Sequence, residues 1–112
     1  MQEDPIRFRS HKWEIEGLYH AGHTKRGVVI THPHPIYGGN MFNPVVAAIV
    51  AAYQKREFTT LRFNFPYKEK GKKSPDTEST LIRTWQSAVS HVLNNERFPV
   101  DRVVAAGKSM GG

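Results

Sequence analysis

The stretch Val103-Val104-Ala105-Ala106-Gly107-Lys108-Ser109-Met110-Gly111-Gly112 decides which fold the sequence predicts. A short apolar run, which predicts a strand, leads directly into the pattern Gly-x-Ser-x-Gly. In this pattern a strand turns sharply into a helix, small glycines allow the close approach, and the serine lies at the tip. We therefore expect Ser109 to be a nucleophile. The Met110 backbone N–H would point toward the oxyanion that forms when a carbonyl carbon is attacked.

Two other interpretations apply to the same residues. Gly-Lys-Ser also ends phosphate-binding loops, but such a loop needs another glycine five positions before Gly107, where this sequence has Arg102. A plain glycine-rich turn remains open, because the pattern fixes few positions. The preceding strand favours the elbow over the plain turn.

A second informative stretch begins with the β-branched run at residues 27–31. It continues through residues 32–40, His-Pro-His-Pro-Ile-Tyr-Gly-Gly-Asn. The run predicts a strand buried on both faces of a parallel sheet, and the loop leaves its carboxyl end, where such sheets bind ligands. An oxyanion hole needs a second N–H donor from a loop at this place. Pro33 and Pro35 have no N–H, so His34 is the first donor after the strand.

The His-x-His spacing in this loop also raises the question of a metal. A catalytic zinc normally has three protein ligands, and no third candidate follows His32 and His34 within several residues. We therefore predict no metal and no cofactor, and we expect both rings to be packed or hydrogen-bonded. A less favoured alternative is that one of them approaches Ser109 as a base, which would require a separation of about 3 Å.

The rest of the chain alternates between strand and helix patterns. The predicted elements are an edge strand at 12–19 interrupted at Gly17, a helix opened by Asn43-Pro44, a strand at 58–65, a helix from 75 or 76 to 94, and the final strand at 102–106. This alternation predicts an α/β fold with a mostly parallel sheet. Crossover helices are expected on both of its faces.

Length and composition set the outer limits. The 112 residues predict a single domain, 1–112, and the lack of cysteine excludes disulfides and cysteine metal sites. Residues 1–11 are polar and are expected to be mobile, and they do not resemble a signal peptide. With no apolar run long enough to cross a membrane, we expect a cytoplasmic protein without a membrane partner.

The formal charge of +6 could indicate a nucleic-acid partner. Much of it lies at Lys68, Lys70, Lys72 and Lys73, inside a segment that contains proline, glycine and serine. This composition is typical of a solvated loop, and no recognition motif accompanies it. We therefore predict that the protein does not bind nucleic acid.

Taken together, residues 13–112 resemble the amino-terminal half of a small α/β-hydrolase-fold protein of the dienelactone-hydrolase-like, predicted esterase kind. The matching segments are His-Pro-His-Pro-Ile-Tyr-Gly-Gly-Asn-Met at 32–41, Leu-Arg-Phe-Asn-Phe at 61–65 and Gly-Lys-Ser-Met-Gly-Gly at 107–112. The first segment resembles one group of bacterial hydrolases. A second group, the testis-expressed hydrolase-like proteins, is similar in Asn-Phe-Pro-Tyr-Lys-Glu-Lys-Gly at 64–71, in the Pro75-Asp76 and Trp85 that follow, and in Gly-Lys-Ser-Met-Gly-Gly at 107–112.

The resemblance implies a serine hydrolase acting on a small-molecule ester or acyl substrate, with Ser109 as nucleophile and Met110 and His34 as oxyanion donors. In this fold the acid and the base follow the serine along the chain, whereas all six histidines here precede Ser109. We therefore expect an incomplete triad and little activity from the 112 residues alone. The alternative is a catalytically silent scaffold or interaction module. In either case, unpaired sheet edges could lead to self-association.

Overall fold

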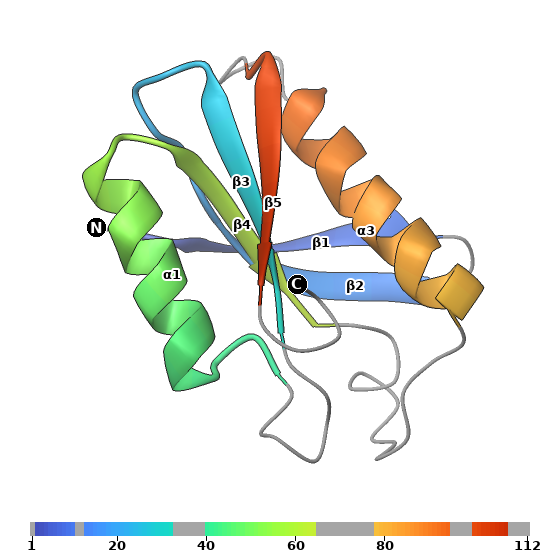
Figure 1. Ribbon diagram of the computed structural model, residues 1–112. Coiled ribbons are helices and arrows are strands. Elements are labelled where there is room, and N and C mark those ends of the chain that lie inside the picture. The colour runs from blue at the N-terminus through green and yellow to red at the C-terminus, as the bar shows by residue number, and fades with distance from the viewer. Residues whose placement is uncertain (1, 11–12, 33–39, 65–77, 95–99, 108–112) are drawn as a thin grey trace.

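The computed structural model describes residues 2–10, 13–32, 40–64, 78–94 and 100–107, which form a five-stranded sheet with a helix on each face (Figure 1). Its elements are β1 (Asp4–Ser10), β2 (Trp13–His20), β3 (Arg26–Thr31), α1 (Pro44–Lys55), β4 (Thr59–Phe63), α3 (Glu78–Leu93) and β5 (Arg102–Gly107). The strand order is β1-β2-β4-β3-β5. Strand β3 is parallel to β4 and β5, whereas β2 is antiparallel to β1 and β4. The predicted α/β class with crossover helices is confirmed.

The amino-terminal segment differs from the expectation of a mobile tail. Residues 4–10 pair with β2 along their whole length, from Asp4 opposite Tyr19 to Ser10 opposite Trp13. The physical reason is Phe8, which is buried and meets Phe63 edge-on at 5.9 Å between ring centroids. The edge strand is therefore β1, and β2 is an interior strand.

The expected interruption at Gly17 is also absent from β2, because Gly17 pairs with Ile6 on one side and Phe63 on the other. A Cβ atom at this position would lie 2.8 Å from the Arg62 carbonyl oxygen. The glycine thus permits a close approach of β2 and β4 and does not mark a bulge.

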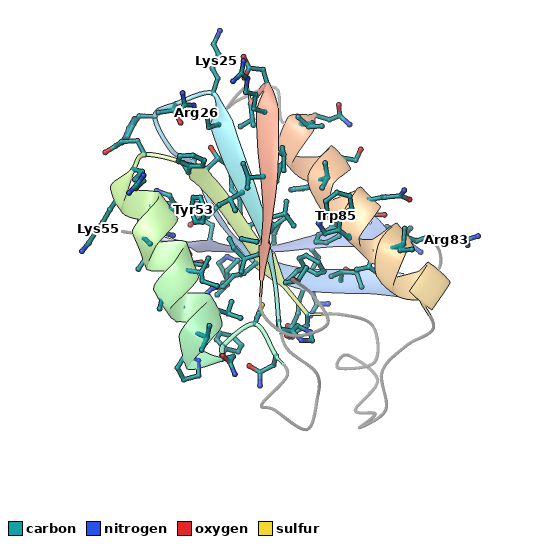
Figure 2. The ribbon with its side chains drawn as sticks, viewed as in Figure 1. Lys25, Arg26, Tyr53, Lys55, Arg83 and Trp85 are labelled. Carbon is teal, nitrogen blue, oxygen red and sulfur yellow. The ribbon has the colours of Figure 1, made fainter. Side chains whose placement is uncertain are left out.

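Each face of the sheet has its own apolar core. The α1 face contains Val28, Ile30, Val46 and Val50. The α3 face contains Phe8, Ile15, Tyr19, Val29, Leu61, Phe63, Ala88, Val92 and Val100. Tyr53 of α1 and Trp85 of α3 point inward from their helices, while Lys55 and Arg83 point outward (Figure 2). Period-two alternation along the strands sends neighbouring residues to opposite cores.

The first helix begins as the sequence predicts. The Asn43 side chain accepts a hydrogen bond from the Val45 N–H at 2.9 Å, and Pro44 occupies the first helical position. The helix ends at Lys55, after which Glu57 adopts a left-handed φ of 67°.

The second helix buries only part of its apolar surface. Ala88 and Val92 are fully buried, whereas Ile82 and Leu93 are exposed. The region where its start was expected, before residue 78, lies outside the described residues. Within the part of the chain that the structure describes, neither helix is long and apolar enough to cross a membrane.

Candidate active site

The carboxyl ends of β3 and β5 lie side by side. The last pair in their parallel register is Thr31 with Gly107, and the Thr31 hydroxyl donates to the Ala106 carbonyl oxygen at 3.4 Å. The segments that carry the predicted site residues continue from these two ends. Ser109, Met110 and His34 themselves lie outside the described residues.

His32 follows β3 directly and is fully buried. It is therefore packed into the protein at the base of the loop, as we expected for a structural role of this ring. Among the described residues, no group of three or more histidine, cysteine, aspartate or glutamate side chains is arranged to hold a metal ion.

The other described histidines lie elsewhere. His20 pairs with Thr60 at the beginning of β4, and its Nδ1 is 2.8 Å from the Gln2 carbonyl oxygen. His23 precedes β3 and lies 3.7 Å from the exposed Glu57 carboxylate. Both sites are at the amino-terminal ends of the parallel strands, opposite the edge where His32 lies.

His91, for which the sequence suggested no partner, packs on α3 against two aromatic rings. Its ring centroid lies 5.7 Å from that of Phe8 and 6.2 Å from that of Tyr19. Burial lowers the pKa of the His91 imidazole below its ordinary value. The next residue, Val92, approaches Gly27 at the beginning of β3. This turn of α3 is therefore remote from the carboxyl ends of β3 and β5.

The chain re-enters the described structure at Asn40 and forms a tight turn before α1. The side-chain Oδ1 of Asn40 accepts a hydrogen bond from the Phe42 N–H at 2.7 Å. The backbone carbonyl of Asn40 accepts one from the Asn43 N–H at 3.1 Å. Met41, between them, is only 4% exposed. Its N–H donates to Asn64 Oδ1 at 2.8 Å, and its carbonyl accepts from Arg62 Nη1 at 3.1 Å.

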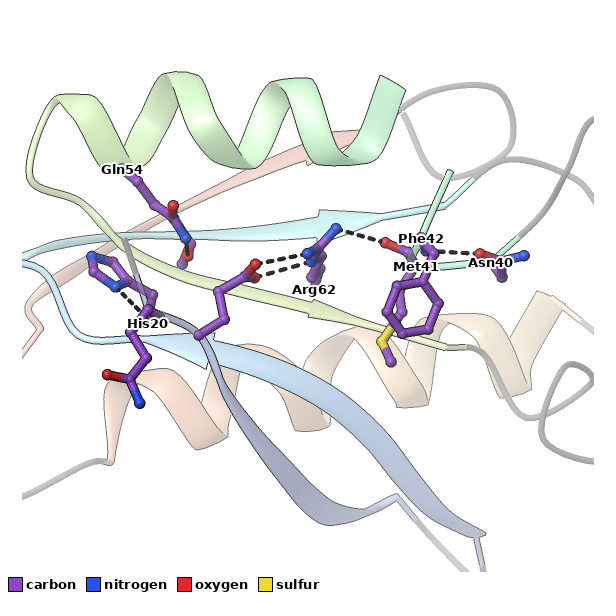
Figure 3. Close-up of polar contacts among 9 residues, drawn as sticks. His20, Asn40, Met41, Phe42, Gln54 and Arg62 are labelled. Carbon is purple, nitrogen blue, oxygen red and sulfur yellow. Dashed lines mark hydrogen bonds and ion pairs between the residues drawn. The ribbon is translucent and has the colours of Figure 1, made fainter. Parts of the chain in front are cut away.

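Two acidic residues, Glu3 and Glu16, bind the side chains of Arg62 and Asn64. Arg62 donates to both carboxylate oxygens of Glu3, at 3.0 and 2.7 Å (Figure 3). Asn64 Nδ2 donates to Glu16 Oε1 at 2.6 Å. Arg62 and Asn64 lie within the segment 61–65, and the sequence alone predicted no role for either side chain. The available signal was that these polar residues alternate with the apolar Leu61 and Phe63, which are fully buried.

Described residues line two surface grooves. One of about 490 Å³ lies beside Met41 and Phe42 and is lined by Ile6 and Leu18 of the first two strands. A larger one of about 880 Å³ lies between β1 and α3, where His91 is located. Only the smaller groove adjoins the segment that returns from the loop after β3, so it is the one connected with the candidate site.

Comparison with known proteins gives the chain a family context. Residues 25–112 match the family described as "Alpha/beta hydrolase domain". None of the curated proteins compared with the chain matches it. A candidate alpha/beta hydrolase of unknown function from Agrobacterium tumefaciens is 30% identical, with a TM-score of 0.84 over 96% of this chain and 50% of that protein.

Two further solved structures resemble the chain in fold. An alpha-beta serine hydrolase homologue from Coxiella burnetii is 24% identical, with a TM-score of 0.72 over 99% of this chain and 54% of that one. A serine hydrolase without a lid from Xanthomonas campestris is 19% identical, with a TM-score of 0.78 over 98% and 52%. The chain therefore spans about half the length of these structures.

Proposed function

The chain belongs to the alpha/beta hydrolase domain family, and on this basis we propose that it carries the nucleophile and the oxyanion donors of a serine hydrolase. The observation that supports the proposal most directly is the pairing of Thr31 with Gly107. It means that the elbow segment and the loop containing His34 start from adjacent strand ends. A nucleophile and an oxyanion donor have to meet at such a point.

The proposed chemistry is attack on the carbonyl carbon of a small ester or acyl substrate. Ser109 Oγ forms the new bond to carbon, the carbonyl electron pair moves to oxygen, and the serine proton passes to a base. The Met110 and His34 N–H groups donate to the resulting oxyanion. Donors of this kind are effective because they are aligned before charge develops and need not reorganise.

The base is the part of the mechanism for which this sequence offers least. In this fold the acid and base follow the serine along the chain, whereas all six histidines here precede Ser109. Of the described histidines, only His32 lies at the carboxyl edge of the sheet. We therefore assign the nucleophile and the oxyanion donors to these 112 residues. His32 is the less favoured alternative for the base, beside a residue that follows Ser109 as in the rest of the family.

Reaction with a fluorophosphonate probe tests the proposal. We expect a slow adduct, located by intact mass and peptide mapping on Ser109 and faster at higher pH, where more of the hydroxyl is deprotonated. Ser109→Ala should abolish the adduct. Ser90→Ala, which changes an exposed serine on α3, should leave it unchanged.

Two results would contradict the proposal. An adduct that persists in Ser109→Ala would place the reactive residue elsewhere. A chain that is folded by circular dichroism but gives no adduct would favour the catalytically silent scaffold. In a parallel assay, loss of the adduct in His32→Gln but not in a variant of another described histidine would identify His32 as the base.

A further inference from the structure

We propose that Arg62 and Asn64 are positioning residues that hold the backbone at Met41, where the chain returns from the loop after β3. The inference rests on the proposed function, because that loop contains the expected oxyanion donor at His34. Arg62 lies in β4 and Asn64 is the first residue after this strand, and both side chains bind the same residue, Met41. Neither residue is proposed to touch the substrate.

Both backbone polar groups of Met41 are held by side chains. The Met41 N–H donates to Asn64 Oδ1 at 2.8 Å, and the Met41 carbonyl accepts from Arg62 Nη1 at 3.1 Å. Met41 is buried, so water does not readily replace either partner. Removing one side chain would leave a buried backbone group without its hydrogen bond, and the segment would have to move to satisfy it.

The side chains of Arg62 and Asn64, which together we call the clamp, are themselves held in place by acidic residues. Arg62 forms a two-pronged ion pair with Glu3, and the two side chains are only 12% and 16% exposed. Such paired, charge-assisted hydrogen bonds restrict orientation as well as adding energy. Asn64 is held by Glu16 through its side-chain amide at 2.6 Å and through its backbone N–H at 3.1 Å.

An aromatic ring also contacts the Arg62 guanidinium. The Phe42 ring lies 5.8 Å from the Arg62 guanidinium carbon, so the residue after Met41 is also in contact with the clamp (Figure 3). Phe42 is 62% exposed, which leaves this contact at the surface of the smaller groove. The clamp therefore joins β2, β4 and the residue before β1 to the turn that begins α1.

The functional consequence follows from where this segment lies. On the other side of residues 33–39, His32 is buried beside the end of β3. With Met41 clamped, the backbone is held on both sides of the expected donor at His34. A preorganised donor stabilises an oxyanion better than one that must move into place, so loss of the clamp should slow the chemical step at Ser109.

The chain offers matched variants for a test. Asn64→Leu keeps the approximate volume and removes both side-chain hydrogen bonds. The double variant Glu16→Gln with Asn64→Asp exchanges donor and acceptor between the two positions and retains one carboxylate, so it should rescue the clamp. Thr60→Val is the control, because it removes a buried hydrogen bond of β4, from Gln54 at 3.2 Å, that does not involve Met41.

Hydrogen exchange of peptides covering residues 32–42 gives a readout that does not depend on catalysis. In Asn64→Leu we expect exchange at Met41 to be at least about tenfold faster, beyond any change in global stability. The fluorophosphonate rate constant at Ser109 should fall by about tenfold or more, since loss of a single oxyanion donor typically costs more than that. The double variant should recover both values to within a factor of about three. Thr60→Val should change neither.

The outcomes separate the two proposals. Unchanged exchange in Asn64→Leu, or equal slowing of labelling by Thr60→Val, would overturn the positioning role. If the wild-type chain gives no adduct at all, the proposed function fails, and the exchange arm alone decides whether the clamp holds Met41. Should Asn64→Leu not fold, Arg62→Lys replaces it, because lysine keeps the charge but cannot bind Glu3 and Met41 with the same fork.

Discussion

Gly17→Ala adds one methyl group at the most crowded point between two interior strands. The new Cβ would lie 2.8 Å from the Arg62 carbonyl oxygen and 3.1 Å from Leu61 Cδ1. Both distances are shorter than an ordinary contact of about 3.5 Å. Strand β2 is paired on both sides at this residue, with Ile6 and Phe63, so it cannot relax toward an open edge.

The expected magnitude is the difference between two effects. Alanine lowers the entropy of the unfolded chain, which favours folding by about 0.5–1 kcal/mol relative to glycine. Overpacking a filled site costs about 1–3 kcal/mol. Because the obstructing atom is a main-chain oxygen that can move only together with β4, we place the cost at the upper end. The net loss in free energy of unfolding is then roughly 2–2.5 kcal/mol, or about 8–20 °C in Tm.

Urea unfolding followed by circular dichroism measures this loss as a lower midpoint at an unchanged slope. Glu14→Ala, at an exposed position of the same strand, is the control and should stay within about 0.5 kcal/mol of wild type. A Gly17→Ala chain as stable as wild type, with the same slope, would refute the reasoning. It would mean that β2 and β4 do not approach as closely as the structure has them.

Three further predictions concern the helix ends and the sheet edge. Glu57, with φ of 67°, should gain about 1 kcal/mol of stability as Glu57→Gly, whereas Glu57→Ala should not, because only glycine adopts this conformation without strain; equal denaturation midpoints for the two variants would contradict this. Because burial lowers the pKa of His91, the unfolded chain binds more protons below about pH 6.5. Stability should therefore fall as the pH drops from 6.5 toward the folded pKa, and His91→Gln should flatten the dependence of Tm on pH between about 5 and 7.5; a variant with the wild-type slope would exclude His91 as the cause. Strand β5 is an edge of the described sheet and exposes 44% of Val104, so we expect concentration-dependent self-association in sedimentation that Val104→Lys reduces; a monomer at all concentrations would show that this edge does not pair.

The sequence was sufficient for the elements that depend on local patterns. Asn43 and Pro44 mark the start of α1 because capping and proline geometry involve only neighbouring residues. The β-branched run before His32 and the apolar run before Gly107 indicate strands for the same reason. The α/β class then follows from their alternation with helices. The roles of Ser109, Met110 and His34 stay predictions, since these residues lie outside the described structure.

Other features depend on which distant segments meet. The sequence alone did not indicate the charge-rich strand β1, because the stabilisation gained by burying Phe8 depends on contacts with Phe63 and α3. The strand order and the need for glycine at position 17 likewise come from the pairing of β2 with β4.

The clamp on Met41 is the clearest case of a feature that the sequence alone did not reveal. Alternation along the strand predicted at 58–65 indicates that Arg62 and Asn64 share a face. It does not identify the residues that these side chains contact on that face. Glu3 and Arg62 are 59 positions apart in the chain and meet only once three strands have taken their register. Local periodicity therefore determined the elements and the face each side chain takes. Tertiary register, which is set by contacts between distant residues, decided the partners on that face.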